Sequence, residues 1–275
     1  MALPVGIQIY SVGDHASRDL VGTLKALKEM GYDCVELAGL YGLTAKDMRK
    51  ALREAKIKAV AAHFQLHDIG DDFLSFVAMY KSIGVKYLVF ATVPDELRPV
   101  DGSDNEGILE KWAYMGRICS EQGIQLAFHN HEWDFEKKVD GLYMLDYLRE
   151  HLPHEYFQPE LDVGWVLAAG IDPVEYMSHF YGYLPLVHAK DFQGTLDEST
   201  VEEGKQINRH NFKGFRFCPL GNGNLIFRQC LRRARLTTLS ILLSSRTAAR
   251  GRTPLSAQGS RERISRRSAG KTGKR

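Results

Sequence analysis

Short apolar runs alternate with amphipathic segments along the first 192 residues of the chain. The amphipathic segments space their apolar residues as a helix does, for example Leu20, Leu24, Leu27 and Met30, which predicts helices with one buried face. The apolar runs are nearly continuous, as is typical of parallel strands buried on both faces. We expect strands at residues 6–12, 34–38, 59–65, 87–91, 125–131, 160–166 and 186–192.

Seven strand-and-helix repeats are compatible with either an open doubly wound sheet or a barrel. A doubly wound dinucleotide-binding sheet requires a glycine-rich phosphate loop after its first strand. Residues 10–14 instead read YSVGD, and no GxGxxG motif occurs in the chain. The pattern therefore predicts an α/β fold of the TIM (β/α)8 type with seven strands evident, whose active site lies at the carboxyl ends of the strands.

The charge of the chain is divided unequally between two segments. Residues 226–275 carry 12 arginines and two lysines against one acid, which leaves 22 basic and 33 acidic residues in 1–225. An acidic body argues against nucleic acid as the partner, because phosphate binding requires a basic surface. We expect a barrel domain over residues 1–225 and an Arg-rich C-terminal tail over residues 226–275.

The remaining composition indicates a cytoplasmic protein that does not enter a membrane. No run of 18 apolar residues is present, so no membrane-spanning segment is expected. The four cysteines are scattered without CxxC spacing and no secretory signal is visible, which is typical of a reducing compartment.

Histidines and carboxylates gather where the predicted strands end. The residues concerned are Glu36, His63, the run from His129 to Asp134, Glu160, Asp162, His188, Lys190 and Asp191. Taken singly, Glu36 or His63 fits a hydrogen-bonded structural group equally well, and Asp191 beside Lys190 fits a simple ion pair. Repetition at the same end of three strands favours a metal site, because buried charges must be paired or bound to a metal. Imidazoles and carboxylates without thiolates suit Mn²⁺, Mg²⁺ or Co²⁺ better than a structural zinc.

The order of these motifs resembles the sugar phosphate isomerase/epimerase family, whose members have the xylose isomerase-like TIM barrel. The matching segments are FHNHEWDF at 128–135, ELDVGW at 160–165 with AGIDP at 169–173, HAKDF at 188–192 and PLGNGNL at 219–225. They occur in the family's order across residues 1–225.

The resemblance implies a ligand set for the metal. It consists of a carboxylate after the fifth strand, Asp162, His188 and a glutamate on the eighth strand. Asp134 is the preferred carboxylate after the fifth strand, and Glu132 is the alternative. The side chains expected around the substrate are His63, His129, His131 and Glu160.

The chemistry implied is proton transfer at the carbon next to a carbonyl, through an enediolate. A divalent metal spreads the developing negative charge, and a carboxylate takes the proton. Asp134 or Glu132 is the expected base, and Lys190 is expected to stabilise the oxyanion. The expected function is thus that of a metal-dependent isomerase or epimerase of a small sugar or keto-sugar. We expect no nucleic acid or membrane partner. The sequence is compatible with a homo-oligomer.

Two other functions remain open, and a third is disfavoured. A non-catalytic sugar-binding barrel would bind the same ligands without proton exchange. A dehydratase of a keto-inositol-like substrate would use the same enediolate chemistry. A relative of the apurinic endonucleases is disfavoured by the acidic body.

The C-terminal tail departs from the family pattern. After residue 225 the family has a helix and then a strand ending near a glutamate, whereas the last fifty residues contain no Asp, Tyr or Trp and a single glutamate, Glu262. Our hypothesis is a reading-frame change near codon 226, which genomic DNA would decide. The alternative is a basic tail that contacts nucleic acid or another anionic surface. In the first case we expect the tail to be disordered or poorly packed, an unpaired barrel edge between the first and seventh strands, and impaired activity.

Overall fold

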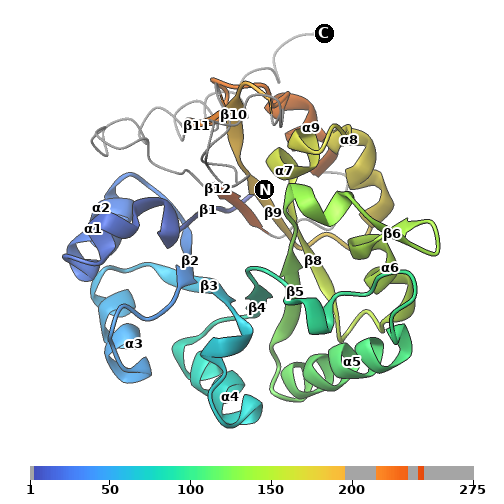
Figure 1. Cartoon of the computed structure of the whole chain (residues 1–275). Helices are drawn as coiled ribbons and strands as arrows, with labels where there is room; N and C mark the ends of the chain where they lie inside the picture. The colour runs from blue at the N-terminus through green and yellow to red at the C-terminus, as the bar shows by residue number, and fades with distance from the viewer. Residues whose placement is uncertain (1–2, 196–214, 235–240, 245–275) are drawn as a thin grey trace, which may run out of the picture.

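The computed structural model describes residues 3–195, 215–234 and 241–244. In this part of the chain, parallel strands close into a barrel in the order β1-β12-β9-β8-β5-β4-β3-β2, with helices around it (Figure 1). This confirms the predicted TIM barrel. The barrel strands are β1 (Val5–Gln8), β2 (Cys34–Ala38), β3 (Lys58–Phe64), β4 (Tyr87–Phe90), β5 (Gln125–His129), β8 (Gln158–Asp162), β9 (Leu186–Ala189) and β12 (Ile241–Ser244).

The helices begin and end at residues suited to these positions. For example, the Asp72 side chain accepts hydrogen bonds from the first turn of α4, and Gly84 ends that helix with φ of 104°, a left-handed conformation that glycine adopts readily. None of the described helices is long and apolar enough to cross a membrane. The α-helices are α1 (Gly13–Ala16), α2 (Leu20–Glu29), α3 (Ala45–Glu54), α4 (Phe73–Ile83), α5 (Asn105–Glu121), α6 (Met144–His151), α7 (Val163–Ala168), α8 (Pro173–Tyr176) and α9 (Phe227–Ala234).

Short elements occupy the loops between the strands and the helices. Two antiparallel hairpins are formed by β6 (Lys138–Val139) with β7 (Leu142–Tyr143), and by β10 (Asp191–Gln193) with β11 (Arg216–Cys218). The 3-10 helices are η1 (Ile9–Val12), η2 (Leu66–Asp68), η3 (Asp95–Leu97), η4 (Glu132–Phe135) and η5 (Met177–Phe180).

The run predicted as a strand over residues 160–166 changes to a helix in its middle. Oδ1 of Asp162 accepts hydrogen bonds from the backbone N–H groups of Gly164 at 2.9 Å and Trp165 at 3.0 Å. These bonds cap the first turn of α7, which stabilises a helix start at this point. The strand therefore ends at Asp162, and the prediction of a strand over residues 163–166 is wrong.

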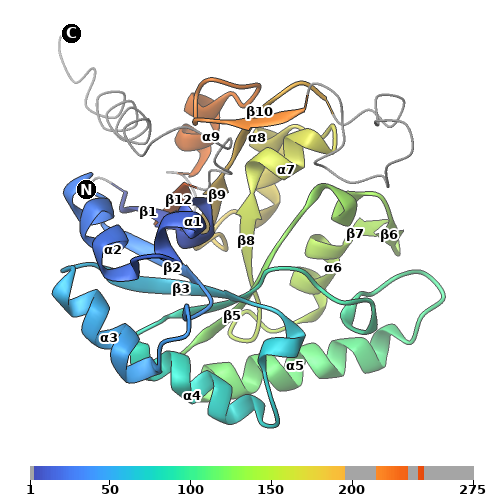
Figure 2. The same ribbon diagram turned by 60° about the vertical axis from the view of Figure 1, so that its left-hand side comes forward.

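The predicted unpaired edge between the first and seventh strands is also wrong. β12 pairs in parallel with both β1 and β9, so that Leu243 is opposite Gly6 on one side and His188 on the other. Before it, α9 packs beside α8 (Figure 2) and buries Phe227 and Cys230. The rest of the tail, residues 235–240 and 245–275, lies outside the described residues. The reading-frame hypothesis stays a prediction.

Asp191 holds the loop that precedes α9. Its Oδ2 accepts hydrogen bonds from the backbone N–H groups of Gly221 at 2.8 Å and Gly223 at 2.9 Å. Its Oδ1 accepts those of Phe192 at 2.9 Å and Leu225 at 3.0 Å. One buried carboxylate thus satisfies four backbone donors. It joins the end of the seventh predicted strand to the PLGNGNL segment.

We expect Asp191→Ala to lower the free energy of unfolding by about 3 kcal/mol or more, because each buried donor left unpaired costs about 1–3 kcal/mol. Urea denaturation of the full chain measures this loss. Asp172→Ala is the matched control, since Asp172 also accepts backbone N–H groups but at the exposed start of α8. Its loss should be about 1 kcal/mol. Equal losses in the two variants would contradict a buried loop-holding role for Asp191.

Candidate metal centre and substrate cavity

A layer of small and apolar side chains fills the lower interior of the barrel. It contains Cys34, Ala61, Val89, Ala127, Leu186 and Leu243. Two residues further along four of these strands stand Glu36, His63, His129 and His188. Because side chains alternate across a strand, residues two apart share a face. These polar residues therefore also face the barrel interior, nearer the carboxyl ends of the strands.

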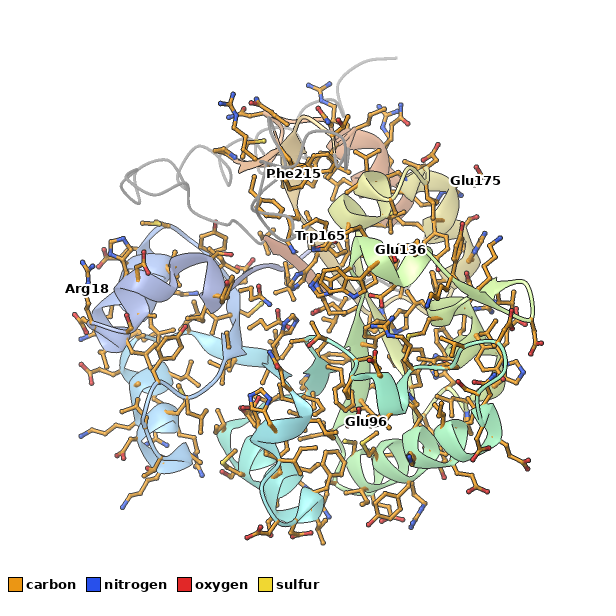
Figure 3. All side chains as sticks on the ribbon, in the orientation of Figure 1. Arg18, Glu96, Glu136, Trp165, Glu175 and Phe215 are labelled. Atoms are coloured by element: carbon orange, nitrogen blue, oxygen red, sulfur yellow. The ribbon has the colours of Figure 1, made fainter. Side chains whose placement is uncertain are left out.

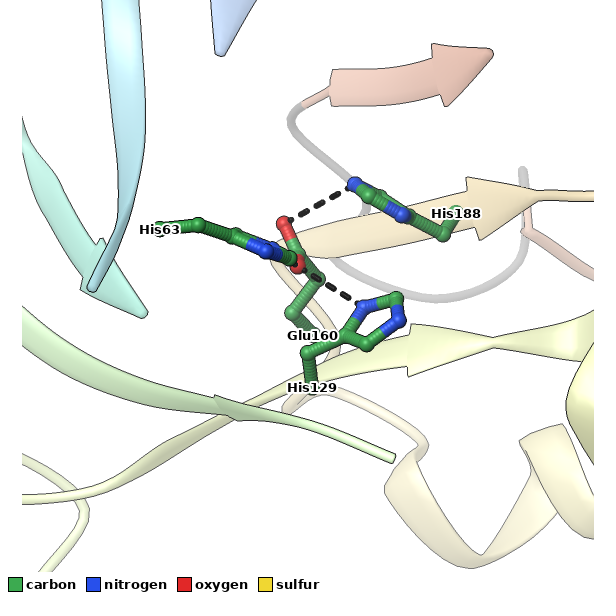
Figure 4. Close-up of side chains that lie close together, drawn as sticks. All are labelled: His63, His129, Glu160 and His188. Atoms are coloured by element: carbon green, nitrogen blue, oxygen red, sulfur yellow. Dashed lines mark hydrogen bonds and ion pairs between the residues drawn. The ribbon is translucent and has the colours of Figure 1, made fainter. Parts of the chain in front are cut away.

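Glu160 of β8 lies at the centre of three imidazoles (Figure 4). Its Oε2 is 2.6 Å from Nε2 of His63 and 3.1 Å from Nδ1 of His129, and its Oε1 is 3.4 Å from Nε2 of His188. One ligand atom from each of these four residues lies within 4.8 Å of the others. We call this group of four residues the histidine–glutamate cluster.

Glu36 of β2 adds a second buried carboxylate beside the histidine–glutamate cluster. Its Oε2 lies 2.8 Å from Nε2 of His188 and 3.3 Å from Nε2 of His63. Both Glu36 and Glu160 are fully buried. Their Oε1 atoms have no hydrogen-bond partner within the described part of the chain.

Burial controls the protonation of the cluster. It lowers the pKa of His129 well below its ordinary value and that of His188 to about 4, so both imidazoles are neutral. Burial would lower the pKa of His63 as well, but the carboxylates of Glu36 and Glu160 outweigh this effect and raise it. Burial, followed for Glu160 by the charge of Glu36, raises the pKa of both carboxyls. The neutral imidazoles of His129 and His188 lie beside buried carboxylates whose Oε1 atoms accept no hydrogen bond from the described residues. This arrangement fits a divalent cation, which would stabilise the ionised carboxylates.

Asp162 faces the opposite side of two of these imidazoles. Its Oδ2 is 3.6 Å from Nε2 of His129 and 4.0 Å from Nδ1 of His188. However, Nζ of Lys190 lies 2.9 Å from the same oxygen and 4.7 Å from the centre of the Trp165 ring. An ammonium group therefore already neutralises the Asp162 side. Figure 3 labels Trp165 among the side chains of the molecule.

Asp134 lies away from the histidine–glutamate cluster. Arg98, which follows η3, forms an ion pair with Oδ1 of Asp134. Oδ2 of Asp134 accepts the backbone N–H of His131 at 2.7 Å. Both oxygens are thus engaged, and the geometry does not fit the predicted ligand role of Asp134. Glu132, the alternative, is in the same 3-10 helix and is not among the residues that line the cavity.

A cavity of about 520 Å³ opens above the cluster at the carboxyl ends of the strands, a size that suits a small-molecule ligand. His63 and His129 of the cluster reach its surface, together with His131 and Lys190. Polar and aromatic side chains complete the lining, among them Gln8, Gln65, Tyr10 and Phe217.

The structure brings together four residues that the sequence singled out, but in different combinations. His63, His129 and Glu160 were expected around the substrate, and here they surround one another and His188, an expected ligand. Lys190 reaches the cavity and contacts Asp162. The roles of all these residues stay predictions.

One participant, Arg98, was missed. Glu36 was noted at a strand end with the others but was given no role at the site. Arg98 follows η3 in a loop, and nothing in its sequence neighbourhood indicates that it reaches Asp134.

Several solved structures share this fold. A sugar phosphate isomerase/epimerase from Parabacteroides distasonis has a TM-score of 0.72 at 20% identity, covering 96% of this chain and 94% of its own. A probable 3-DHS dehydratase, AsbF, from Bacillus anthracis has a TM-score of 0.71 at 11% identity, covering 96% and 99%. A xylose isomerase-like TIM barrel protein from Mycobacterium smegmatis, in complex with magnesium, has a TM-score of 0.63 at 14% identity, covering 96% and 95%.

At these identities the structures show a common fold only. No curated protein shows significant sequence similarity to the chain. The sequence profile described as "Xylose isomerase-like TIM barrel" matches residues 24–264, which is most of the chain. The chain therefore belongs to the xylose isomerase-like TIM barrel family.

Proposed function

We propose that the chain is a metal-dependent isomerase or epimerase that moves a proton at the carbon next to the carbonyl of a sugar or keto-sugar. The observation that carries this proposal is the convergence of three imidazoles and a buried glutamate beneath a cavity whose wall includes the lysine Lys190. Such a site combines a place for a cation with a hydrogen-bond donor in the wall of the same cavity. Membership of the xylose isomerase-like family is consistent with it.

The histidine–glutamate cluster would hold the divalent ion, for which the sequence predicted Mn²⁺, Mg²⁺ or Co²⁺. Bound there, such an ion supplies Lewis-acid stabilisation of the negative charge that develops on the carbonyl oxygen. His63 and His129 reach both the cluster and the cavity, so they connect the metal centre to the substrate.

Lys190 donates a hydrogen bond to the developing oxyanion in this proposal. Asp162 holds its ammonium group by an ion pair of 2.9 Å, and the ring of Trp165 packs against it. A donor fixed before the reaction needs no reorganisation when the charge develops, which is the condition for strong electrostatic stabilisation.

His131 takes the proton from the substrate carbon. It lines the cavity and is not one of the four residues of the histidine–glutamate cluster, which places it beside the substrate. Its ring stacks on Trp133 with centroids 4.3 Å apart and an angle of 9° between planes. Asp134 accepts the backbone N–H of His131. In this proposal Asp134 positions His131, whereas the sequence analysis expected Asp134 itself to be the general base.

Inversion at a carbon also needs a group that returns the proton to the opposite face. The strand-eight glutamate implied by the family resemblance is not found in β12, which reads ILLS. We therefore expect proton exchange with solvent to be detected more readily than net epimerisation, and turnover to be weak compared with a relative that carries the glutamate.

Solvent-deuterium incorporation tests the proposal. The purified full-length chain is incubated in D₂O with a panel of keto-sugars and inososes and with Mn²⁺, Mg²⁺ or Co²⁺, and deuterium at the α-carbon is followed by NMR. Metal-dependent exchange that chelator abolishes is the expected result. Binding without exchange would instead indicate a sugar-binding barrel, and a product that has lost water would indicate a dehydratase. Either outcome overturns the isomerase proposal.

A further inference from the structure

The cavity is larger than a single sugar ring requires. A hexose has about 12 non-hydrogen atoms, and at the loose packing of liquid water, about 30 Å³ for each such atom, it fills roughly 360 Å³. This is an upper estimate, because a sugar ring is more compact than the same number of water molecules. The cavity holds about 520 Å³. Space for a further part of the substrate therefore remains when one ring is bound.

The described lining of the cavity has an inner and an outer part. The inner part includes His63 of the histidine–glutamate cluster. Gln65 follows two residues later with an extended backbone, φ −123° and ψ 161°, so its side chain shares the face of His63 and lies about 7 Å nearer the mouth. His67 and Asp68 of η2 and Tyr10 of η1 also line the cavity. We call Tyr10, Gln65, His67 and Asp68 the outer subsite.

The side chains of the outer subsite are accessible to a ligand. Tyr10 is 67% exposed although it borders the cavity. The side chains of His67 and Asp68 are 76% and 47% exposed. These groups are thus not committed to the packing of the core, in contrast to the buried cluster below them.

The outer subsite combines an aromatic face with a polar pair, which matches the chemistry of a sugar ring. The face of the Tyr10 ring carries partial negative charge, which attracts the C–H groups of a pyranose. Oδ1 of Asp68 lies 3.6 Å from Nε2 of His67, so the two side chains offer an acceptor and a donor to neighbouring hydroxyls. Oδ2 of Asp68 accepts the backbone N–H of Gln65 at 2.7 Å, which fixes the turn that carries the pair.

From these observations we infer that the substrate is a keto-disaccharide, whose reacting ring lies in the inner part of the cavity and whose second ring is held by the outer subsite. The inference rests on the proposed function for the identity of the reacting ring. The second ring takes no part in proton transfer. Its binding orients the reacting ring, since contacts to a remote part of a substrate can be used for positioning at the reacting carbon.

Isothermal titration calorimetry on the full-length chain in the presence of Mg²⁺ tests the outer subsite. The probes are D-fructose and three keto-disaccharides, turanose, lactulose and palatinose, which carry a hexosyl ring on different hydroxyls of fructose. At least one of the three should bind about tenfold to a hundredfold more tightly than fructose, the gain that a second bound ring supplies. If none of them binds more tightly than fructose, the inference is overturned.

Variants of the outer subsite test its location. Tyr10→Ala and His67→Ala should each reduce the ratio of disaccharide to fructose affinity by about threefold to tenfold, the loss of one stacking or hydrogen-bonding partner. The matched control is Tyr181→Ala, which removes a tyrosine that is 71% exposed and is not among the described residues of the cavity lining. It should leave the ratio unchanged. A ratio that falls in Tyr10→Ala and not in His67→Ala would indicate an apolar substituent instead of a sugar and would overturn the assignment.

Deuterium exchange on the same sugars separates this inference from the enzyme proposal. Tighter binding of a keto-disaccharide without exchange in any of them would contradict the enzyme proposal and leave the outer subsite standing. Equal binding and equal exchange for fructose and the disaccharides would contradict the outer subsite alone.

Discussion

Replacing Lys190 by methionine should lower the rate of deuterium exchange at the substrate's α-carbon by about a hundredfold to a thousandfold, the usual loss when one oxyanion donor is removed. Methionine has a similar length and keeps the apolar contact with Trp165, but it has no proton to donate. The variant also leaves Asp162 buried without its cation, so its unfolding must be measured alongside.

The matched control is Lys138→Met, which removes an exposed lysine that also lies over an aromatic ring, that of Tyr143 at 4.6 Å. It should leave the exchange rate unchanged. Initial rates are measured by NMR at saturating substrate with the metal concentration held constant. An exchange rate for Lys190→Met within about threefold of the unmodified chain, well short of the loss expected for an oxyanion donor, would remove Lys190 from the proposed chemistry.

The barrel was predictable because its strands are buried on both faces and therefore read as continuous apolar runs. The limits of that signal appear after Asp162, where VGWV continues the apolar run although the chain has become helical. Apolar content alone does not distinguish a short buried helix from a strand. The capping bonds made by Asp162 decide it, and they depend on a side-chain geometry that no periodicity shows.

The eighth strand was missed for a different reason. β12 has only four residues, ILLS, within a segment dominated by arginines. Its position is determined by its neighbours, because β12 pairs with an edge of β1 on one side and of β9 on the other. Tertiary pairing of this kind overrides a weak local pattern.

The residues of the candidate site were predictable as a group because strand ends of a parallel barrel meet at one face. Their individual partners were not. His129 has two ring nitrogens that point to different carboxylates, and a sequence does not say which of them meets a metal. Asp134 is engaged by Arg98, which lies 36 residues earlier in the chain, and this contact could not be predicted from the sequence.

The ion pair between Arg98 and Asp134 should prove essential for stability, and Arg98→Met should lower the free energy of unfolding by about 3–5 kcal/mol. The side chain of Asp134 is only 2% exposed, and the loss of Arg98 would leave its charge buried and unpaired. The matched control is Lys25→Met, which breaks an exposed pair with Glu54 and should cost about 1 kcal/mol or less. Urea denaturation measures both, and equal costs would contradict a larger contribution of the buried Arg98 pair to stability.

The double variant Arg98→Met with Asp134→Leu separates stability from positioning. With both charges removed, most of the lost stability should return, because an apolar pair can replace a buried ion pair at little net cost. The backbone N–H of His131 would still lack the acceptor that Asp134 provides, so deuterium exchange should remain low in a folded protein. If stability and exchange recover together, Asp134 only neutralises the charge of Arg98 and does not position His131. If stability alone recovers, the pair acts on the site through the hydrogen bond that Asp134 accepts from the backbone of His131.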